Sequence, residues 1–244
     1  MSPTVKDRRS TVKRLAVCKL WGMTFQRARS EEQREIRRQA VLDTALAMLD
    51  EMPVAELSLN ELSRRVGLAK SNVLRYFESR EAVLFQLLER AMDGWLAEVP
   101  DELAAGVDPS LPARERGDQV AAVVGASLAR RTVLLDLVNA QTNVLEHNVS
   151  VDVVVRHKRS ALGYIATAAG LLRRYVPELG DGAARNVTMM TLILAGTLST
   201  YCRPSPSALA AYEADPAVAA LRLDMRATLE DAVATLIAGT LARS

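Results

Sequence analysis

A glycine between two short amphipathic segments is the feature that most restricts the fold of this chain. The stretch from Leu57 to Leu84, LSLNELSRRVGLAKSNVLRYFESREAVL, carries one such segment on either side of Gly67. Glycine adopts the left-handed conformation that ends a helix without steric penalty. Two short helices joined in this way form the helix-turn-helix arrangement. The second segment, 70–76, is mostly polar, so burial in a core does not explain why it exists.

Helix-start and helix-stop patterns divide the first hundred residues into four helices. The segments SEEQ (30–33) and SLNE (58–61) have the capping-box pattern, which satisfies free backbone N–H groups at a helix start. We expect Pro53 to end the first helix and Pro100 to end the fourth, because proline has no N–H to donate. Ser79 is expected to cap that fourth helix. Apolar residues of the first helix recur three and four apart, at Ile36, Ala40, Val41, Ala45, Met48, Leu49 and Met52.

The remainder of the chain shows helical periodicity throughout. Residues 101–112 contain one glycine and two prolines and are expected to be a linker. Beyond it we expect helices near 113–130, 131–147, 151–176, 181–202 and 217–242, with a break at 203–216. The predicted fold is all-α, with a three-helix N-terminal head joined to a larger C-terminal helical domain. The expected division is 1–29 (basic arm), 30–79 (helix-turn-helix head), 80–99 (connecting helix) and 100–244 (second domain).

Positive charge is concentrated at the N-terminus. Residues 1–30 hold eight lysines and arginines against one aspartate, a net +7, whereas the whole chain carries +2. A basic arm on an acidic body indicates a polyanionic partner, and a solvated tail is the alternative. Met23 is an alternative start that would remove most of the arm.

Several functional classes lack support in the sequence. The two cysteines, Cys18 and Cys202, are far apart, and two histidines do not make a metal site. No apolar run reaches the roughly 20 residues of a membrane span. No nucleophile elbow, phosphate-binding loop or dinucleotide fingerprint occurs. We therefore expect a cytoplasmic protein that is not an enzyme and holds no cofactor or metal.

The segment 70–76 has the character of a helix that enters DNA. Val73 and Phe77 are four apart and would form its buried side. The major groove, about 12 Å wide, admits one helix whose other face is polar. The residues left for that face are Lys70, Ser71, Asn72, Leu74, Arg75 and Tyr76. The alternative is a packed helical hairpin whose Lys70 and Arg75 are only solvated.

Side-chain chemistry assigns each residue a role in that interface. Lys70 suits a phosphate or a guanine, and Arg75 can bind either with two parallel hydrogen bonds. Asn72 can pair with an adenine edge, and Leu74 can contact a thymine methyl group. Ser58 and Tyr76 each offer a hydroxyl to a phosphate.

The segment from Val41 to Leu84 resembles, without a gap, the DNA-binding head of the tetracycline-repressor (TetR) family. Its turn glycine, the lysine that opens the recognition helix and the aromatic pair fall on Gly67, Lys70 and Tyr76-Phe77. The chain departs from the family pattern at four places. Pro53-Val54 replace Gly-Phe, Leu57-Ser58 replace Thr-Thr, Ala69 replaces the capping serine, and Leu74 replaces a tyrosine. These changes affect the operator sequence that would be preferred.

The resemblance implies a homodimeric regulator, by default a repressor, that binds a palindromic operator and is released by a small-molecule effector. It implies dimerisation through the helices near 181–202 and 217–242, and a ligand pocket within 113–202. Candidate lining residues are Asn139, Gln141, Asn143, His147, Tyr164, Met189 and Met190. The alternative is a DNA-binding repressor or architectural protein without an inducer.

Overall fold

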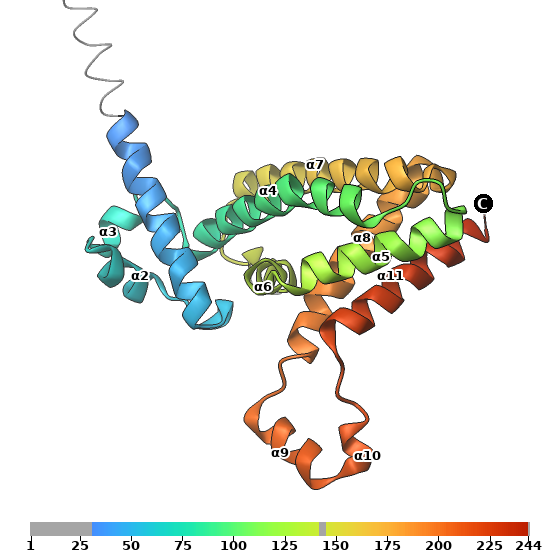
Figure 1. Cartoon of the computed structure of the whole chain (residues 1–244). Helices are drawn as coiled ribbons and strands as arrows, with labels where there is room; N and C mark the ends of the chain where they lie inside the picture. Colours follow the sequence, from blue (N-terminus) through green and yellow to red (C-terminus); the bar gives the residue numbers. More distant parts are fainter. Residues whose placement is uncertain (1–30, 142–144, 244) are drawn as a thin grey trace, which may run out of the picture.

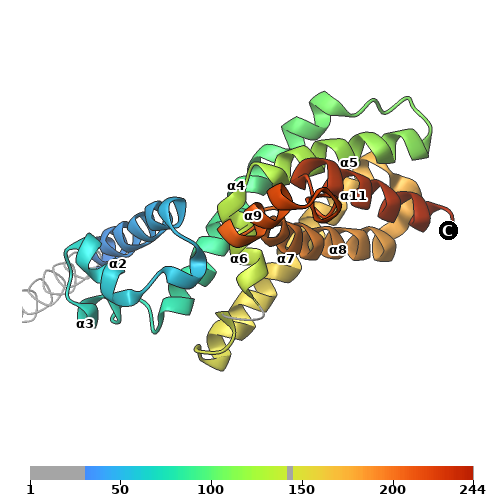
Figure 2. The same cartoon turned by 90° about the horizontal axis from the view of Figure 1, so that it is seen from below.

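The computed structural model describes residues 31–141 and 145–243. These residues form helices, turns and loops with no strand, which confirms the all-α prediction. A small head lies at one end of the molecule, and a larger helical body extends away from it (Figure 1; Figure 2). The predicted arm 1–29 and the predicted cap at Ser30 lie outside the described residues.

The head consists of three helices around a compact apolar core. The first helix covers 31–51, and a 3₁₀ turn, η1 (Val54–Glu56), leads to α2 (Leu59–Val66) and α3 (Lys70–Val73). Of the apolar residues that recur along the first helix, Ile36 and Ala40 are exposed, Ile36 to 62%. That end of the helix extends past the head core. The buried core residues are Val41, Leu42, Ala45, Met48, Leu49, Val54, Leu57, Leu62, Val73 and Phe77.

Helix α4 (Arg80–Gly106) joins the head to the body and is longer than expected. Ser79 caps its start by accepting a hydrogen bond from the Ala82 N–H. The predicted end at Pro100 was wrong, because Pro100 lies inside the helix. Val99 and Leu103 on either side of it are buried, and their burial offsets the roughly 3 kcal/mol that an internal proline costs.

The body packs four long helices beside α4. They are α5 (Ala113–Ala129), α7 (Val151–Tyr175), α8 (Gly180–Tyr201) and α11 (Met225–Leu241), and a short α6 (Thr132–Ala140) lies between α5 and α7 in sequence. The helices expected at 113–130, 151–176 and 181–202 are confirmed within a residue or two. Of the helix expected over 131–147, α6 covers the part to Ala140, and Gln141 and Leu145 beyond it are π-helical. A 3₁₀ turn, η3 (Pro177–Leu179), separates α7 from α8.

An excursion between α8 and α11 departs most from expectation. The predicted break at 203–216 contains α9 (Pro206–Ala214), and the single helix predicted over 217–242 is divided into α10 (Pro216–Ala219) and α11. Asp224 caps α11 by accepting the Ala227 N–H at 2.7 Å. Neither α9 nor α10 has a buried residue, and the pair projects from the body (Figure 1).

Helices α5 and α11 approach each other at two glycines. A Cβ atom on Gly125 would lie 2.5 Å from Cγ of Glu230 and 3.1 Å from its backbone nitrogen. A Cβ on Gly117 would lie 2.7 Å from a methyl carbon of Ile237. The two glycines are eight residues apart on one helix, so they share a face. Their missing side chains permit this close packing.

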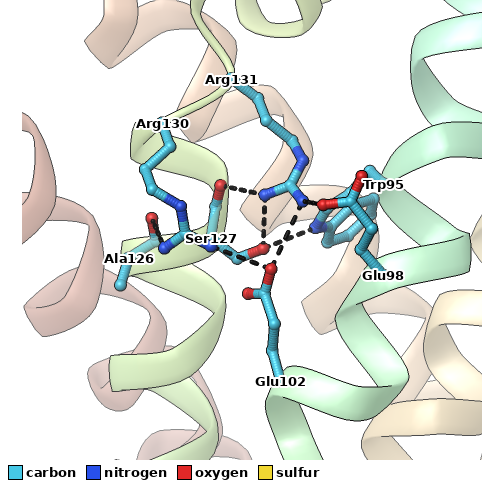
Figure 3. Close-up of polar contacts among 7 residues, drawn as sticks. All are labelled: Trp95, Glu98, Glu102, Ala126, Ser127, Arg130 and Arg131. Carbon is cyan, nitrogen blue, oxygen red and sulfur yellow. Dashed lines mark hydrogen bonds and ion pairs between the residues drawn. The ribbon is translucent and has the colours of Figure 1, made fainter.

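A polar network fixes α4 to the end of α5 (Figure 3). The indole N–H of Trp95 donates to Oγ of buried Ser127 at 3.3 Å. Arg131 donates to the same oxygen at 2.8 Å and pairs with Glu98 at 2.7 Å. Arg130 pairs with Glu102 at 2.9 Å. Because these bonds hold α4 against α5, the body end of the connecting helix is fixed.

Candidate nucleic-acid interface and effector cavity

The turn of the helix-turn-helix is built by a serine and a glycine. Oγ of Ser58 accepts the Glu61 N–H at 3.2 Å and so caps α2. Gly67 ends α2 with φ of +73°, where a side chain would be strained. The Leu68 N–H then donates to the Ser63 carbonyl at 3.0 Å, which closes the helix end. These local bonds set the direction in which α3 leaves the turn.

The polar face of α3 points to solvent and its apolar face is buried. Val73 is fully buried and Phe77 is 3% exposed, as their spacing predicted. The candidate DNA-contacting residues Ser58, Lys70, Ser71, Asn72, Leu74 and Arg75 are exposed, and Tyr76 is half-buried. The exposed side chains of this segment therefore form one mainly polar face, to which Leu74 adds an apolar side chain.

The recognition segment is less helical than expected. Regular helix ends at Val73, and 74–76 continue as turns held by bonds such as Tyr76 N–H to the Val73 carbonyl at 2.9 Å. Ala69 provides no side-chain cap at the start of α3, in agreement with its departure from the family pattern. The hydrophobic anchors Val73 and Phe77 therefore hold the segment in place.

Two arginines of the first helix extend this surface. Arg34 and Arg37 line a cleft of about 360 Å³ together with Gln33, Arg75 and Tyr76. Arg34 also donates to the Arg75 carbonyl at 3.4 Å. Three guanidinium groups thus border one cleft beside α3, a setting that suits a phosphate. Sequence reasoning did not select Arg34 and Arg37, although Arg37 belongs to a pair of adjacent arginines, Arg37-Arg38.

The arginines of α2 are already paired. Glu61 accepts from Arg64 at 2.6 Å and from Arg65 at 2.9 Å, and these hydrogen bonds lower the pKa of Glu61 to about 2. Arg65 also pairs with Glu51 of the first helix at 2.7 Å. The positive charge that remains unpaired near the turn is therefore carried by other residues, including Lys70.

A cavity of about 620 Å³ lies in the body, between α4, α6, α7 and α8. Its size is within the range of small-molecule sites. Helix α4 contributes Leu88 and Met92 to its wall, whereas the sequence placed the pocket within 113–202. The full lining is Leu88, Met92, Val138, Asn139, Gln141, His157, Lys158, Ala161, Leu162, Tyr164, Ile165, Met189, Leu192, Ile193 and Thr197.

The candidate ligand residues divide into three groups. Asn139, Gln141, Tyr164 and Met189 line the cavity. His147 is exposed and Met190 lies on α8 outside the lining, so the structure does not bring them to the cavity. Asn143 lies outside the described residues.

Within the lining, Asn139 donates to the Thr200 hydroxyl at 2.8 Å and Tyr164 donates to the Glu89 carbonyl at 3.3 Å. Burial raises the pKa of Tyr164, and the charge of Asp93 raises it further.

Sequence reasoning missed His157 as a cavity residue. It considered this histidine only as a metal ligand, because a single histidine on a helix carries no signal of its burial.

The described residues contain no group of three or more His, Cys, Asp and Glu side chains that could hold a metal ion. They also contain no helix that is long and apolar enough to cross a bilayer.

Family models match both parts of the chain. One described as "Bacterial regulatory proteins, tetR family" matches residues 41–87. One described as "Tetracyclin repressor-like, C-terminal domain" matches residues 89–244, more than half of the chain. The chain belongs to the TetR family of transcriptional regulators. The resemblance of the head is thereby confirmed, and it extends to the body.

Curated relatives match a short part of this TetR-family chain. The HTH-type transcriptional regulator EthR of Mycobacterium tuberculosis is 37% identical over 57 residues, which is 23% of this chain and 26% of that protein. EthR of Mycobacterium bovis gives the same values. The chain therefore aligns with about a quarter of the length of these relatives.

Solved structures share most of the fold at low identity. A possible TetR-family regulator from Streptomyces coelicolor has a TM-score of 0.54 at 19% identity, with 85% of this chain and 100% of that chain covered. FadR from Bacillus subtilis, solved in complex with stearoyl-CoA, has a TM-score of 0.51 at 15% identity, with 82% and 98% covered. At these identities the likeness concerns the fold.

Proposed function

We propose that this TetR-family protein represses transcription as a homodimer on a palindromic operator and is released when a small molecule occupies the 620 Å³ cavity. The observation that carries the DNA-binding part is the geometry of α3. Its polar face is free for the major groove, and Val73 and Phe77 fix its other face in the head core. Arg34, Arg37 and Arg75 beside it would bind the flanking phosphates.

A dimer follows from the small size of the recognition helix. One such helix contacts too few bases for specific affinity, whereas two heads about 34–36 Å apart read both halves of a palindrome. The proposed interface is formed by α8 and α11. On α11 every fourth residue is exposed and short: Ala227, Asp231, Thr235 and Gly239. Such a face permits close approach of a second copy. Replacing Thr235 by tryptophan should convert the dimer to a monomer in sedimentation experiments.

Release by an effector would use α4, because this helix both lines the cavity and begins directly after the head. A ligand that favours a different head spacing opposes operator binding by linkage. The alternative, a repressor or architectural protein without an inducer, predicts that no small molecule changes operator affinity. The large and mainly apolar cavity favours the first proposal.

The decisive experiment selects operators from random duplex DNA and compares variants. Lys70, Asn72 and Arg75 replaced together by alanine should lower operator affinity at least 100-fold, because each base contact contributes about 1–3 kcal/mol. Arg174→Ala, an exposed arginine at the far end of α7, is the matched control. Unchanged affinity of the folded triple variant would refute the proposed interface.

The N-terminal arm, residues 1–29, is proposed to add phosphate or minor-groove contacts. Its deletion should weaken binding to all sequences and flatten the salt dependence. Unchanged affinity after deletion would assign the arm no role in DNA binding.

A further inference from the structure

His157 is a buried polar side chain without a hydrogen-bond partner. It is 3% exposed, and neither Nδ1 nor Nε2 has a partner among the described residues. Its ring stacks on Phe85 of α4, with ring centroids 4.2 Å apart and planes at 29°. Stacking holds the ring in place but satisfies neither nitrogen. A buried donor and acceptor left unpaired cost free energy, which a bound molecule with matching groups would recover.

The imidazole borders two spaces at once. On one side it is part of the wall of the 620 Å³ cavity, and most of its neighbours there are aliphatic or methionine side chains. On the other side it borders a cleft of about 160 Å³ that Tyr76, Phe77 and Glu78 of the head also line. The same ring therefore lies between the effector cavity and the end of the recognition segment.

The charges around the cavity do not favour an anionic ligand. Lys158, the cation in the wall, is paired with Glu146 at 2.5 Å. Glu89 and Asp93 lie next to Tyr164, where their negative charges raise its pKa. Burial, with a smaller contribution from Lys158, lowers the pKa of His157 to about 4, so the ring is neutral near pH 7. A neutral imidazole offers one N–H donor and one acceptor nitrogen.

We propose that His157 binds an uncharged hydroxyl or carbonyl oxygen of a mainly apolar effector. This inference rests on the proposed function of the cavity and adds the chemical class of its ligand. The aliphatic wall accepts the apolar part of the molecule, and the imidazole pairs with its oxygen. Because the ring also stacks on Phe85 of α4, the contact reaches the helix that leads to the head.

Histidine NMR gives a direct test, since the chain has only two histidines. The wild-type protein, labelled with ¹⁵N in histidine, is titrated with 1-octanol, 2-octanone, octane and octanoate. The alcohol and the ketone should shift the ring nitrogen signals of His157 and leave those of exposed His147 unchanged. Failure of both to bind, a shift at His147 alone, or tighter binding of octanoate than of 1-octanol would overturn the proposal.

Variants separate hydrogen bonding from packing. His157→Phe keeps a ring against Phe85. It should lower the affinity for 1-octanol and 2-octanone at least tenfold and change the affinity for octane less than threefold. An equal loss of affinity for octane, or no loss of affinity for 1-octanol, would overturn the proposal. His147→Phe is the control. Operator affinity is measured separately. Octanol binding through His157 without any change in operator affinity supports the inference and refutes the sensor role.

Discussion

Ser150 donates two hydrogen bonds to Glu78 and thereby joins the body to the head. Its backbone N–H reaches Oε1 of Glu78 at 2.7 Å, and its hydroxyl reaches Oε2 at 3.0 Å. Glu78 lies two residues after the recognition segment, and Ser150 caps α7, which lines the cavity. Helix α4 is the covalent connection between the two parts, and this pair is a second connection. A movement of the start of α7 would therefore be transmitted to the end of the recognition segment.

We expect Glu78→Ala to weaken this connection with little effect on folding. Two exposed hydrogen bonds to a carboxylate contribute about 1–2 kcal/mol, so thermal unfolding should begin a few degrees earlier. The larger effect should be on operator affinity, because the head becomes free to adopt other spacings. Fluorescence anisotropy with a selected operator measures it. Glu213→Ala, on exposed α9, is the control, and equal operator affinities of the two variants would contradict the proposed transmission.

Arg34 and Arg37 should act as phosphate contacts rather than base contacts. Replacing both by alanine removes two positive charges next to Arg75, so the slope of log affinity against log salt should fall in magnitude by about 2. The loss should be similar for the operator and for unrelated DNA. A loss confined to the operator would show instead that these arginines contribute to sequence recognition.

Gly125→Ala should destabilise the body. The new Cβ would lie 3.1 Å from the backbone nitrogen of Glu230 and 2.5 Å from its Cγ, so α5 and α11 would have to separate. Overpacking of this kind costs about 1–3 kcal/mol, which chemical denaturation measures. Gly163→Ala is the matched control at an exposed position of α7, where a Cβ meets nothing within 4 Å. It should stabilise by about 0.5–1 kcal/mol, since alanine favours helix. The proposed packing is wrong if both changes have the same sign.

Stability should fall as the pH is lowered from 7 to 4, in part through His157. The pKa of His157 is about 4 in the folded protein, below the ordinary value of 6.5, because burial disfavours the charged ring. As the pH falls, this histidine therefore takes up a proton in the unfolded chain before it does so in the folded protein. The free energy of unfolding is lower by about 3 kcal/mol at pH 4 for this reason.

Denaturation between pH 6.5 and 4.5 isolates this effect, because carboxylates protonate mostly below that window. His157→Phe should flatten the curve of unfolding free energy against pH in this window. His147→Gln is the control and should leave the contribution of buried His157 to that curve unchanged. A curve of the same slope in His157→Phe would contradict the burial of a neutral ring.

The features predicted correctly from the sequence are those that depend on a few neighbouring residues. The turn at Gly67, the caps at Ser58 and Ser79, and the burial of Val73 and Phe77 follow from local bonds and helical spacing. The limits of α5, α7 and α8 follow from the same signals. These features are predictable because the groups that decide them lie within one or two helical turns of each other.

The remaining features depend on packing between helices. Pro100 remains inside α4 because burial of its neighbours outweighs its local cost. Arg34 and Arg37 lie beside Arg75 because the first helix packs across α3. His157 is buried against Phe85, 72 positions earlier in the chain, and the cavity is formed by side chains of four different helices. Burial of this kind depends on how helices pack, and local periodicity contains no record of which helix faces which.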